Sequence, residues 1–358
     1  MKRFARKGMF LALGVGIAAL AVSAAAVAST KKKSSNIQVC VLLPDTQSSV
    51  RWTQFDPKYI GAALKKANVT YSMNNALNDP SKQTAQAQAC LAAGAKGVIE
   101  VSLDNGSASA IEKLFTSKGG WAIDYDRQVT GGTAAVYDAF DGTAVGAAQA
   151  NGIIAAMKAK HTYKPSSIVA ELWGGQTDQN AFWFKSGNDK VLNPLFKQHK
   201  LKKGPQKFVP DWDANNAAGI YDQMLLKTNN KIKGVIAAND NIAGAVIARE
   251  KAHHLKPVPL SGQDTTAAGV QQILAGWQSG TVYKYVPLEA NAAAAAAIAL
   301  LHGKKPKSNS FRMNGTKKEP TLVLPVTWIT KNNYKQLFKQ GWLKKSEVCI
   351  GQYAKYCK

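Results

Sequence analysis

Short runs of consecutive apolar residues alternate with segments of helical periodicity along most of the chain. In the first part of the sequence, strands are expected at 37–43, 70–73, 97–103 and 121–125, and helices at 57–67, 80–95 and 107–117. The pattern resumes after Phe140 and Asp141, with strands at 168–173, 207–209, 235–238 and 257–260 and helices at 143–157, 179–196, 216–226 and 243–252.

Most of these strands are apolar throughout instead of alternating apolar and polar positions. Continuous apolar strands are typical of parallel sheets that are covered by helices on both faces. Because the strand–helix alternation is sustained twice, the sequence predicts an α/β fold of two doubly wound parallel-sheet lobes. About 330 residues remain after the N-terminal segment, which is enough for two domains of ordinary size.

The N-terminal 28 residues have the features of a secretory signal. Lys2, Arg3, Arg6 and Lys7 precede an apolar run over 9–28, which ends in the cleavage-like sequence Ala-Val-Ala at 26–28. A cleaved signal peptide at 1–28 is expected, and with it a location in the periplasm or outside the cell. A retained anchor is the alternative, because the run is rich in alanine and basic residues follow it at 31–33. The Ala-rich stretch at 290–301 is too short to span a bilayer and is expected to be a buried helix.

The net charge of +24 falls to +20 when the four basic residues of the leader are removed. Such a charge could attract nucleic acid. The lysines, however, are scattered over predicted helix faces and turns, and no basic stripe is interleaved with aromatic residues. A basic, solvated surface is therefore favoured over a nucleic-acid site.

The four cysteines suit an oxidising compartment. Cys349 and Cys357 lie close together near the C-terminus and are the first candidate pair, and Cys40 with Cys90 would be the second. Buried free thiols are the alternative for Cys40 and Cys90. Four cysteines allow three pairings, which the sequence does not separate.

Polar residues follow the predicted strands at five places. These are Asp45, Asp104-Asn105, Asp126-Arg127, Asn239-Asp240 and Gln263-Asp264. A single polar pair of this kind could simply form a turn or cap the helix that follows the strand. Five at the same topological position favour a ligand cleft, because ligands of such sheets bind beyond the carboxyl ends of the strands.

Several segments of the chain resemble a known family. They are Arg51-Trp52, 123–127, Phe140-Asp141, Gly174-Gly175 with 178–181, Trp212 with 216–217, 238–240, 261–264, and 275–276 through 281–284. In this order and spacing the sequence resembles the pentose- and hexose-binding branch of the periplasmic binding proteins, and most closely its members that bind D-xylose. Phe182, Gly142, the loop at 211–213 and the cysteine-bearing tail depart from the family pattern.

The resemblance implies a topology in which the chain crosses between two lobes three times, near Asp141, Lys284 and Pro325. The first lobe would comprise residues 37–141 and 285–324, and the second 142–284 and 325–358. It also implies a monomeric, non-enzymatic component of an ABC sugar importer, which closes around one monosaccharide and is recognised by the membrane permease. A chemoreceptor or a sensor kinase is an alternative or additional partner, and glucose, galactose or arabinose are alternative ligands.

The matching residues suit the chemistry of a sugar. Carboxylates accept hydrogen bonds from adjacent hydroxyls, cationic groups donate, amides do both, and indole rings cover the C–H faces. The expected ligand-binding residues are the acceptors Asp126 and Asp264, the donors Arg51, Arg127 and Lys284, the amides Asn180 and Asn239, and the stacking pair Trp52 and Trp212. Core packing is expected for Trp121, Trp277, Trp328 and Trp342. For Trp173 and Trp183 the sequence does not decide between core packing and ligand binding.

Other functions fit the sequence less well. A pair of carboxylates facing a sugar also describes a glycosidase, but a nearby cation should keep both Asp126 and Asp264 ionised, whereas a general acid needs a raised pKa. No hydrolase, metalloprotease or P-loop signature occurs, His253 and His254 are adjacent and diverge on a helix, and no metal or cofactor is expected. A sugar-responsive repressor would need a DNA-binding head where this chain carries its leader.

Overall fold

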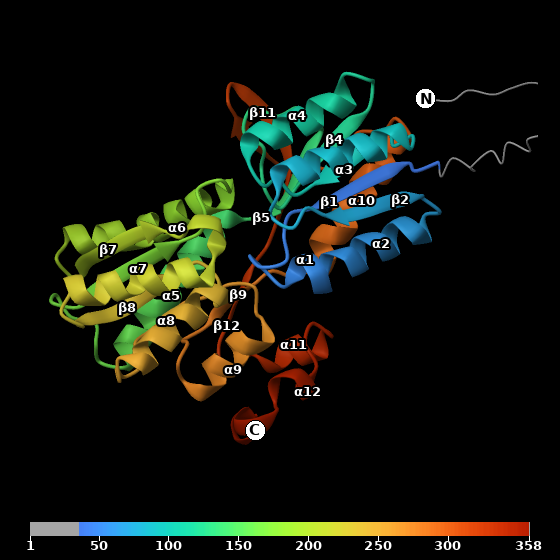
Figure 1. Ribbon diagram of the computed structural model, residues 1–358. Coiled ribbons are helices and arrows are strands. Elements are labelled where there is room, and N and C mark those ends of the chain that lie inside the picture. The colour runs from blue at the N-terminus through green and yellow to red at the C-terminus, as the bar shows by residue number, and fades with distance from the viewer. Residues whose placement is uncertain (1–35, 358) are drawn as a thin grey trace, which may run out of the picture. The chain divides into compact units, whose positions relative to one another are not determined.

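The computed structural model describes residues 36–357, which contain a seven-stranded β-sheet, a three-stranded sheet and a two-stranded sheet, flanked by helices (Figure 1). The three-stranded and two-stranded sheets are together called the second sheet. The signal peptide expected at 1–28 lies outside the described residues. The α/β fold with mainly parallel sheets is confirmed. Among the described residues, no helix is long and apolar enough to cross a membrane.

The first sheet has seven strands in the order β10-β11-β5-β4-β3-β1-β2, all parallel to their neighbours except β10. The strands are β1 (Val39–Leu43), β2 (Tyr71–Asn75), β3 (Gly97–Glu100), β4 (Trp121–Tyr125), β5 (Val136–Phe140), β10 (Ser310–Asn314) and β11 (Lys317–Leu324). The helices around this sheet are α1 (Arg51–Gln54), α2 (Asp56–Lys66), α3 (Pro80–Ala92), α4 (Asn105–Thr116) and α10 (Val286–Leu301).

Strand β1 shows why the apolar runs are continuous. Val39 and Val41 belong to the core that includes α2 and α10, whereas Cys40 and Leu42 belong to the core that includes α3 and α4. Successive side chains point to opposite faces of a strand, and here both faces are covered by helices. All five residues of β1 are therefore buried.

The second sheet is smaller and less regular. Strands β6 (Ile168–Trp173), β7 (Lys202–Phe208) and β8 (Ile232–Ala237) pair in the order β7-β6-β8, while β9 (Thr281–Tyr283) and β12 (Thr327–Ile329) form an antiparallel pair. The strand expected at 257–260 is reduced to a bridge between Leu260 and Val235. Around these strands lie α5 (Gly142–Ala159), α6 (Gln179–Lys197), the 3₁₀ turn η1 (Pro210–Trp212), α7 (Ala214–Lys227), α8 (Asp240–Ala252) and α9 (Ala267–Ala275).

The chain passes between the two sets of strands three times. These passages follow β5 at Asp141, β9 at Lys284, and β11 at Pro325, where β12 begins two residues later. That the two sets of strands belong to lobes that move against each other stays a prediction.

The C-terminal tail returns to the core of the first sheet. It contains α11 (Lys335–Lys339), α12 (Lys345–Val348) and the 3₁₀ turn η2 (Gly351–Tyr356). Leu337, Trp342 and Val348 share a hydrophobic core with residues of α2 and α10. The structure joins Cys349 to Cys357 within this tail, and it joins Cys40 of β1 to Cys90 of α3.

Candidate functional site

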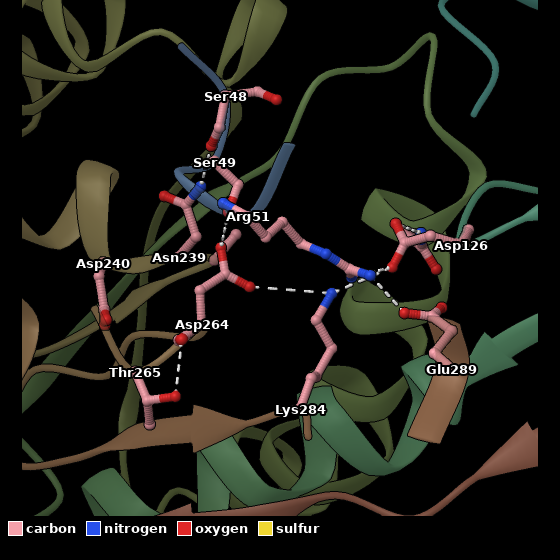
Figure 2. Close-up of polar contacts among 12 residues, drawn as sticks. Ser48, Ser49, Arg51, Asp126, Asn239, Asp240, Asp264, Thr265, Lys284 and Glu289 are labelled. Carbon is pink, nitrogen blue, oxygen red and sulfur yellow. Dashed lines mark hydrogen bonds and ion pairs between the residues drawn. The ribbon is translucent and has the colours of Figure 1, made fainter. Parts of the chain in front are cut away.

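All nine residues that the sequence analysis selected for ligand binding line one cavity between the two sheets. The cavity is bounded by loops and helix starts that follow β1, β4, β6, β7, β8 and β9, five of which are strands of the parallel sheets, whose carboxyl ends are the expected place for a ligand. Its lining consists of Ser48, Ser49, Arg51, Trp52, Asp126, Arg127, Asp178, Asn180, Phe184, Trp212, Asn239, Gln263, Asp264 and Lys284. Figure 2 shows how several of these side chains converge.

The guanidinium of Arg51 is buried among three carboxylates. Its Nη2 donates to Asp56 at 2.6 Å and also to Glu289, and its Nη1 donates to Asp126 at 2.6 Å (Figure 2). Burial opposes the charge of Arg51, but the carboxylates of Asp56, Glu289 and Asp126 more than offset this and raise its pKa well above the ordinary value. Asp56 and Glu289, which come from α2 and α10, thus hold a charged donor in place toward the cavity.

Asp126 is an ionised acceptor. Burial alone would raise its pKa, but Lys284, Arg51 and Arg127 more than compensate and lower the pKa to about 2. Lys284 Nζ lies 3.3 Å from its Oδ1, and Asn180 donates to its backbone oxygen at 2.7 Å. Because Asn180 lies in the first turn of α6, which follows β6, this last bond joins the two sheets across the cavity.

Asp264 lies on the opposite side of the cavity and accepts a bond from the first sheet. The hydroxyl of Ser49 donates to its Oδ2 at 2.9 Å, and Lys284 Nζ lies 3.8 Å from its Oδ1 (Figure 2). Lys284 therefore stands between the two carboxylates that the sequence analysis chose as acceptors.

Three of the nine residues adopt the left-handed backbone conformation. The φ angles of Asp126, Trp212 and Asp264 are 62°, 57° and 92°. Such angles are unfavourable for residues other than glycine, at roughly 1–3 kcal/mol each, and they tend to cluster at ligand sites. Their concentration around one cavity indicates that the backbone is held to aim these side chains.

Arg127 forms a second link across the cavity. Its Nε lies 3.1 Å from Oδ2 of Asp178, and its Nη2 donates to the hydroxyl of Ser48 at 3.3 Å. The ring of Trp52 lies under both arginines, with Cζ of Arg51 4.4 Å and Cζ of Arg127 5.6 Å from the ring centre. Trp52 thus packs against the cations as well as lining the cavity.

Asn239 has two roles. Its Oδ1 accepts from the backbone N–H of Ile242 and caps α8, and its Nδ2 donates to the backbone oxygen of Ser48 at 3.0 Å. Asn239 thus caps α8 and also lines the cavity.

Trp212 closes one wall of the cavity, edge-on to Phe184 at 6.1 Å between ring centres. Glycine is required at Gly174, because a Cβ there would lie 2.1 Å from the Trp212 ring. Among the described residues that line the cavity, Arg127 Nε, Trp212 Nε1, Gln263 Oε1 and Asp264 Oδ1 are buried without a hydrogen-bond partner. Arg127 Nε and Asp264 Oδ1 have only an oppositely charged group nearby, at 3.1 Å and 3.8 Å. Two donors and two acceptors in this cavity can thus bond to another molecule.

Not every polar residue at a strand end belongs to the cavity. Asp104 caps α4 through the backbone N–H groups of Gly106 and Ser107, so the simpler helix-cap explanation applies there. Asp45 accepts from Ser48 and lies 3.9 Å from Arg127 behind the lining.

The other tryptophans lie outside the lining of the cavity. Trp121 and Trp342 are buried in the first core, and Trp277 and Trp328 pack on the second. Trp173 and Trp183, for which the sequence favoured neither role, are also absent from the lining.

Five lining residues were not selected as ligand-binding residues from the sequence, although Gln263 was noted as a polar residue at a strand end: Ser48, Ser49, Asp178, Phe184 and Gln263. Each lies within four positions of a selected residue, and Phe184 follows Asn180 by about one helical turn. The available signal was this proximity, because a loop or helix start that presents one side chain to a cavity also presents its neighbours.

The described residues contain no group of three or more histidine, cysteine, aspartate or glutamate side chains arranged to hold a metal ion. The charged groups of the cavity instead pair with one another, carboxylate with guanidinium or ammonium. The arrangement is one of fixed hydrogen-bond donors and acceptors.

The chain is similar to known proteins in sequence and in fold. A family model described as "Periplasmic binding protein domain" matches residues 39–305. The D-xylose-binding periplasmic protein of Escherichia coli K12 is 35% identical over 67% of this chain and 71% of its own length, and that of Haemophilus influenzae is 27% identical over 91% and 96%. A carbohydrate transporter solute-binding protein from Chloroflexus aurantiacus, solved in complex with D-glucose, superimposes with a TM-score of 0.79 at 26% identity, covering 87% of this chain and 98% of that one.

Proposed function

Since the chain belongs to the family of periplasmic binding proteins, we propose that it binds one monosaccharide, in the first place D-xylose, between its two sheets. The observation that carries the proposal is the cavity itself. It combines an ionised carboxylate, three cations, amides and indole rings from both sheets, with buried donors and acceptors left unpaired.

These groups match a ring that bears hydroxyls around its rim. Each hydroxyl donates one hydrogen bond and accepts others, so it can serve an acceptor such as Asp264 Oδ1 and a donor such as Trp212 Nε1. Bonds to the charged groups Arg51 and Lys284 are the strong ones. The faces of Trp52 and Trp212 offer apolar area to the C–H faces of the sugar.

Binding requires the two sides, which are in direct contact here, to separate and then to close again on the sugar. The cavity volume is about 20 Å³, which is room for water and not for a sugar ring. The sugar must therefore replace direct contacts between the sides, such as Ser49 with Asp264 and Arg127 with Asp178, by its own hydroxyls. A ligand that bonds to both sides binds the closed form more tightly than the open form. This difference in affinity is what shifts the equilibrium toward the closed form.

The cavity argues against a glycosidase. Asp126 is held ionised by its cations and cannot act as a general acid near neutral pH. The relatives that match over most of the chain are named as binding proteins. Delivery of the sugar to an ABC permease, from the periplasm or the outer face of the membrane, is the role that fits such a protein.

The test is a panel of aldoses read by thermal shift and calorimetry on the mature chain. A ligand that binds only the folded state raises Tm as its concentration increases. D-Xylose is expected to raise Tm and to bind with one site per chain, with D-glucose, D-galactose and L-arabinose as the competing assignments. A panel of simple sugars that gives neither a shift in Tm nor heat on mixing would refute the proposal.

A further inference from the structure

A second, larger space lies on the outer side of the sugar cavity. It is a groove of about 530 Å³, bordered by α1 and α2 on one side and by α9 and the C-terminal tail on the other. We call it the outer groove, and its lining includes Phe55, Tyr59, Lys58, Trp342, Lys344 and Glu347. Its aromatic and charged side chains form a surface that could contact the second ring of a disaccharide.

A narrow passage links the outer groove to the sugar cavity. It shares Ser49, Arg51, Asp264 and Lys284 with the cavity, and it shares Val50, Phe55 and Trp342 with the groove. The passage has a volume of about 0 Å³, so it does not admit even a water molecule. The side chains at its outer end therefore separate the two spaces.

Phe55 and Trp342 form that separation. Their rings are stacked, with centres 4.0 Å apart and planes 19° apart, although Phe55 follows α1 and Trp342 comes from the tail. Trp342 is 4% exposed, whereas Phe55 is half-buried.

Trp342 is fixed in this place from three directions. Its Nε1 donates to the backbone oxygen of Thr265 at 3.0 Å, and its ring lies 5.5 Å from that of Tyr283. Gly341 precedes it with φ of 67°, a left-handed turn that glycine adopts at little cost. Thr265 itself follows the acceptor Asp264, so the barrier is attached to the sugar-binding loop.

We propose that the stacked rings of Phe55 and Trp342 restrict this protein to single-ring sugars. The inference rests on the proposed function. A substituent on the hydroxyl that faces Asp264 and Ser49 would point along the passage and would meet the two rings before it reached the outer groove. The rings thus set the length of the ligand, while the polar residues of the cavity set its stereochemistry.

Truncating either ring should open the passage. Trp342→Ala removes the larger ring, and Phe55→Ala is an independent route to the same opening that leaves the buried Trp342 in the core. Trp342→Phe keeps a ring in place and serves as the conservative variant. Trp277→Ala, which removes a partly buried indole from the second core, is the matched control for the loss of a tryptophan.

The experiment compares D-xylose with β-1,4-xylobiose by calorimetry, or D-glucose with cellobiose if D-glucose proves the tighter monosaccharide. The unsubstituted protein should bind the disaccharide at least 100-fold more weakly than the monosaccharide. In Trp342→Ala and in Phe55→Ala this ratio should fall at least tenfold, and in Trp342→Phe and Trp277→Ala it should stay within about twofold.

An unchanged ratio in both folded alanine variants, or equal binding of both sugars by the unsubstituted protein, would overturn the inference while leaving the proposed function intact. Failure of the unsubstituted protein to bind any monosaccharide would instead overturn both. If Trp342→Ala does not fold, as circular dichroism would reveal, Phe55→Ala decides the question.

Discussion

The ammonium group of Lys284 lies 3.3 Å from Oδ1 of Asp126, although the two residues are 158 positions apart in the sequence. The same group lies 3.8 Å from Oδ1 of Asp264. Lys284 occupies one of the passages of the chain between the sheets, so a single cation supports an acceptor on each side of the cavity. The cation lowers the pKa of Asp126 and keeps this carboxylate available for hydroxyls in a buried site.

The contribution of ionised Asp126 to sugar affinity should persist down to about pH 4. Asp126 has a pKa of about 2, because Lys284, Arg51 and Arg127 outweigh the effect of burial. Since this pKa is below that of the unfolded chain, the stabilisation from ionised Asp126 is full above about pH 4 and is lost as the pH falls through 2. In Lys284→Met the pKa of Asp126 should rise, so the affinity should be weaker and should begin to fall at a higher pH than in the unsubstituted protein.

Calorimetric titrations from pH 8 to pH 3 on both proteins check this prediction. Parallel pH profiles for the two proteins would mean that Lys284 does not control the ionisation of Asp126.

Replacing Asp264 by asparagine should weaken sugar binding by about 10- to 100-fold. The change keeps the shape of the side chain but removes the charge from hydrogen bonds that are worth about 1.5–3 kcal/mol each when charged. Asp104→Asn is the matched control, because Asp104 only caps α4 and asparagine caps helices equally well. Calorimetry should show an unchanged affinity for the control, and an equal loss in both variants would remove Asp264 from the site.

Stability should decrease as the pH rises above about 4. Glu100 is buried on β3, and neither of its carboxyl oxygens has a hydrogen-bond partner among the described residues. Burial, reinforced by Glu112 and Asp104, raises its pKa well above the ordinary value. As the pH rises, Glu100 loses its proton in the unfolded chain at a lower pH than in the folded protein, which favours unfolding. The protonated group therefore makes its full contribution to stability below about pH 4. This contribution is lost as the pH rises toward the folded-state pKa, by about 1.4 kcal/mol per pH unit.

Glu100→Gln should remove this part of the pH dependence. Urea unfolding of both proteins at pH 4.5, 6 and 7.5 should show a smaller decrease in unfolding free energy for the variant. A variant with the slope of the unsubstituted protein would contradict the assignment to Glu100.

The two disulfides should contribute unequally to stability. Cys40 and Cys90 are 50 positions apart, whereas Cys349 and Cys357 are 8 apart. By the loop-entropy relation, the longer loop is worth about 4 kcal/mol and the shorter about 2.5 kcal/mol. Unfolding of Cys40→Ala/Cys90→Ala and Cys349→Ala/Cys357→Ala in urea measures the difference, and a larger loss from the C-terminal pair would show that local packing of the tail outweighs loop entropy.

The sequence predicted most of the strands that are buried on both faces, although β5, in which all five residues are buried, was not expected. Strand β1 is recognisable because every residue in it is apolar. Strand β7 is an edge strand with three lysines and several exposed positions, so only its last residues were expected. The hairpin of β10 and β11 was not assigned for the same reason, since Phe311 and Met313 are exposed and the neighbouring residues are polar.

The site was more predictable than its electrostatics. Charged and aromatic residues at strand ends can be seen in a sequence, and all nine selected residues line the cavity. Asp56 and Glu289, which hold Arg51 from α2 and α10, lie inside helices and carry no such signal. A residue that acts by supporting another one becomes visible only when distant segments are brought together.

The three passages of the chain between the sheets restrict how this molecule can deform. The last of them consists of Pro325 and Val326, and proline fixes its own φ angle. Three short connections resist twisting and sliding of the two sets of strands relative to each other. A bend about the line that joins the three connections is therefore the easiest distortion. A pair of dyes attached to α3 and α7 would then report essentially a single angle, which would make this scaffold suitable for a ratiometric sensor.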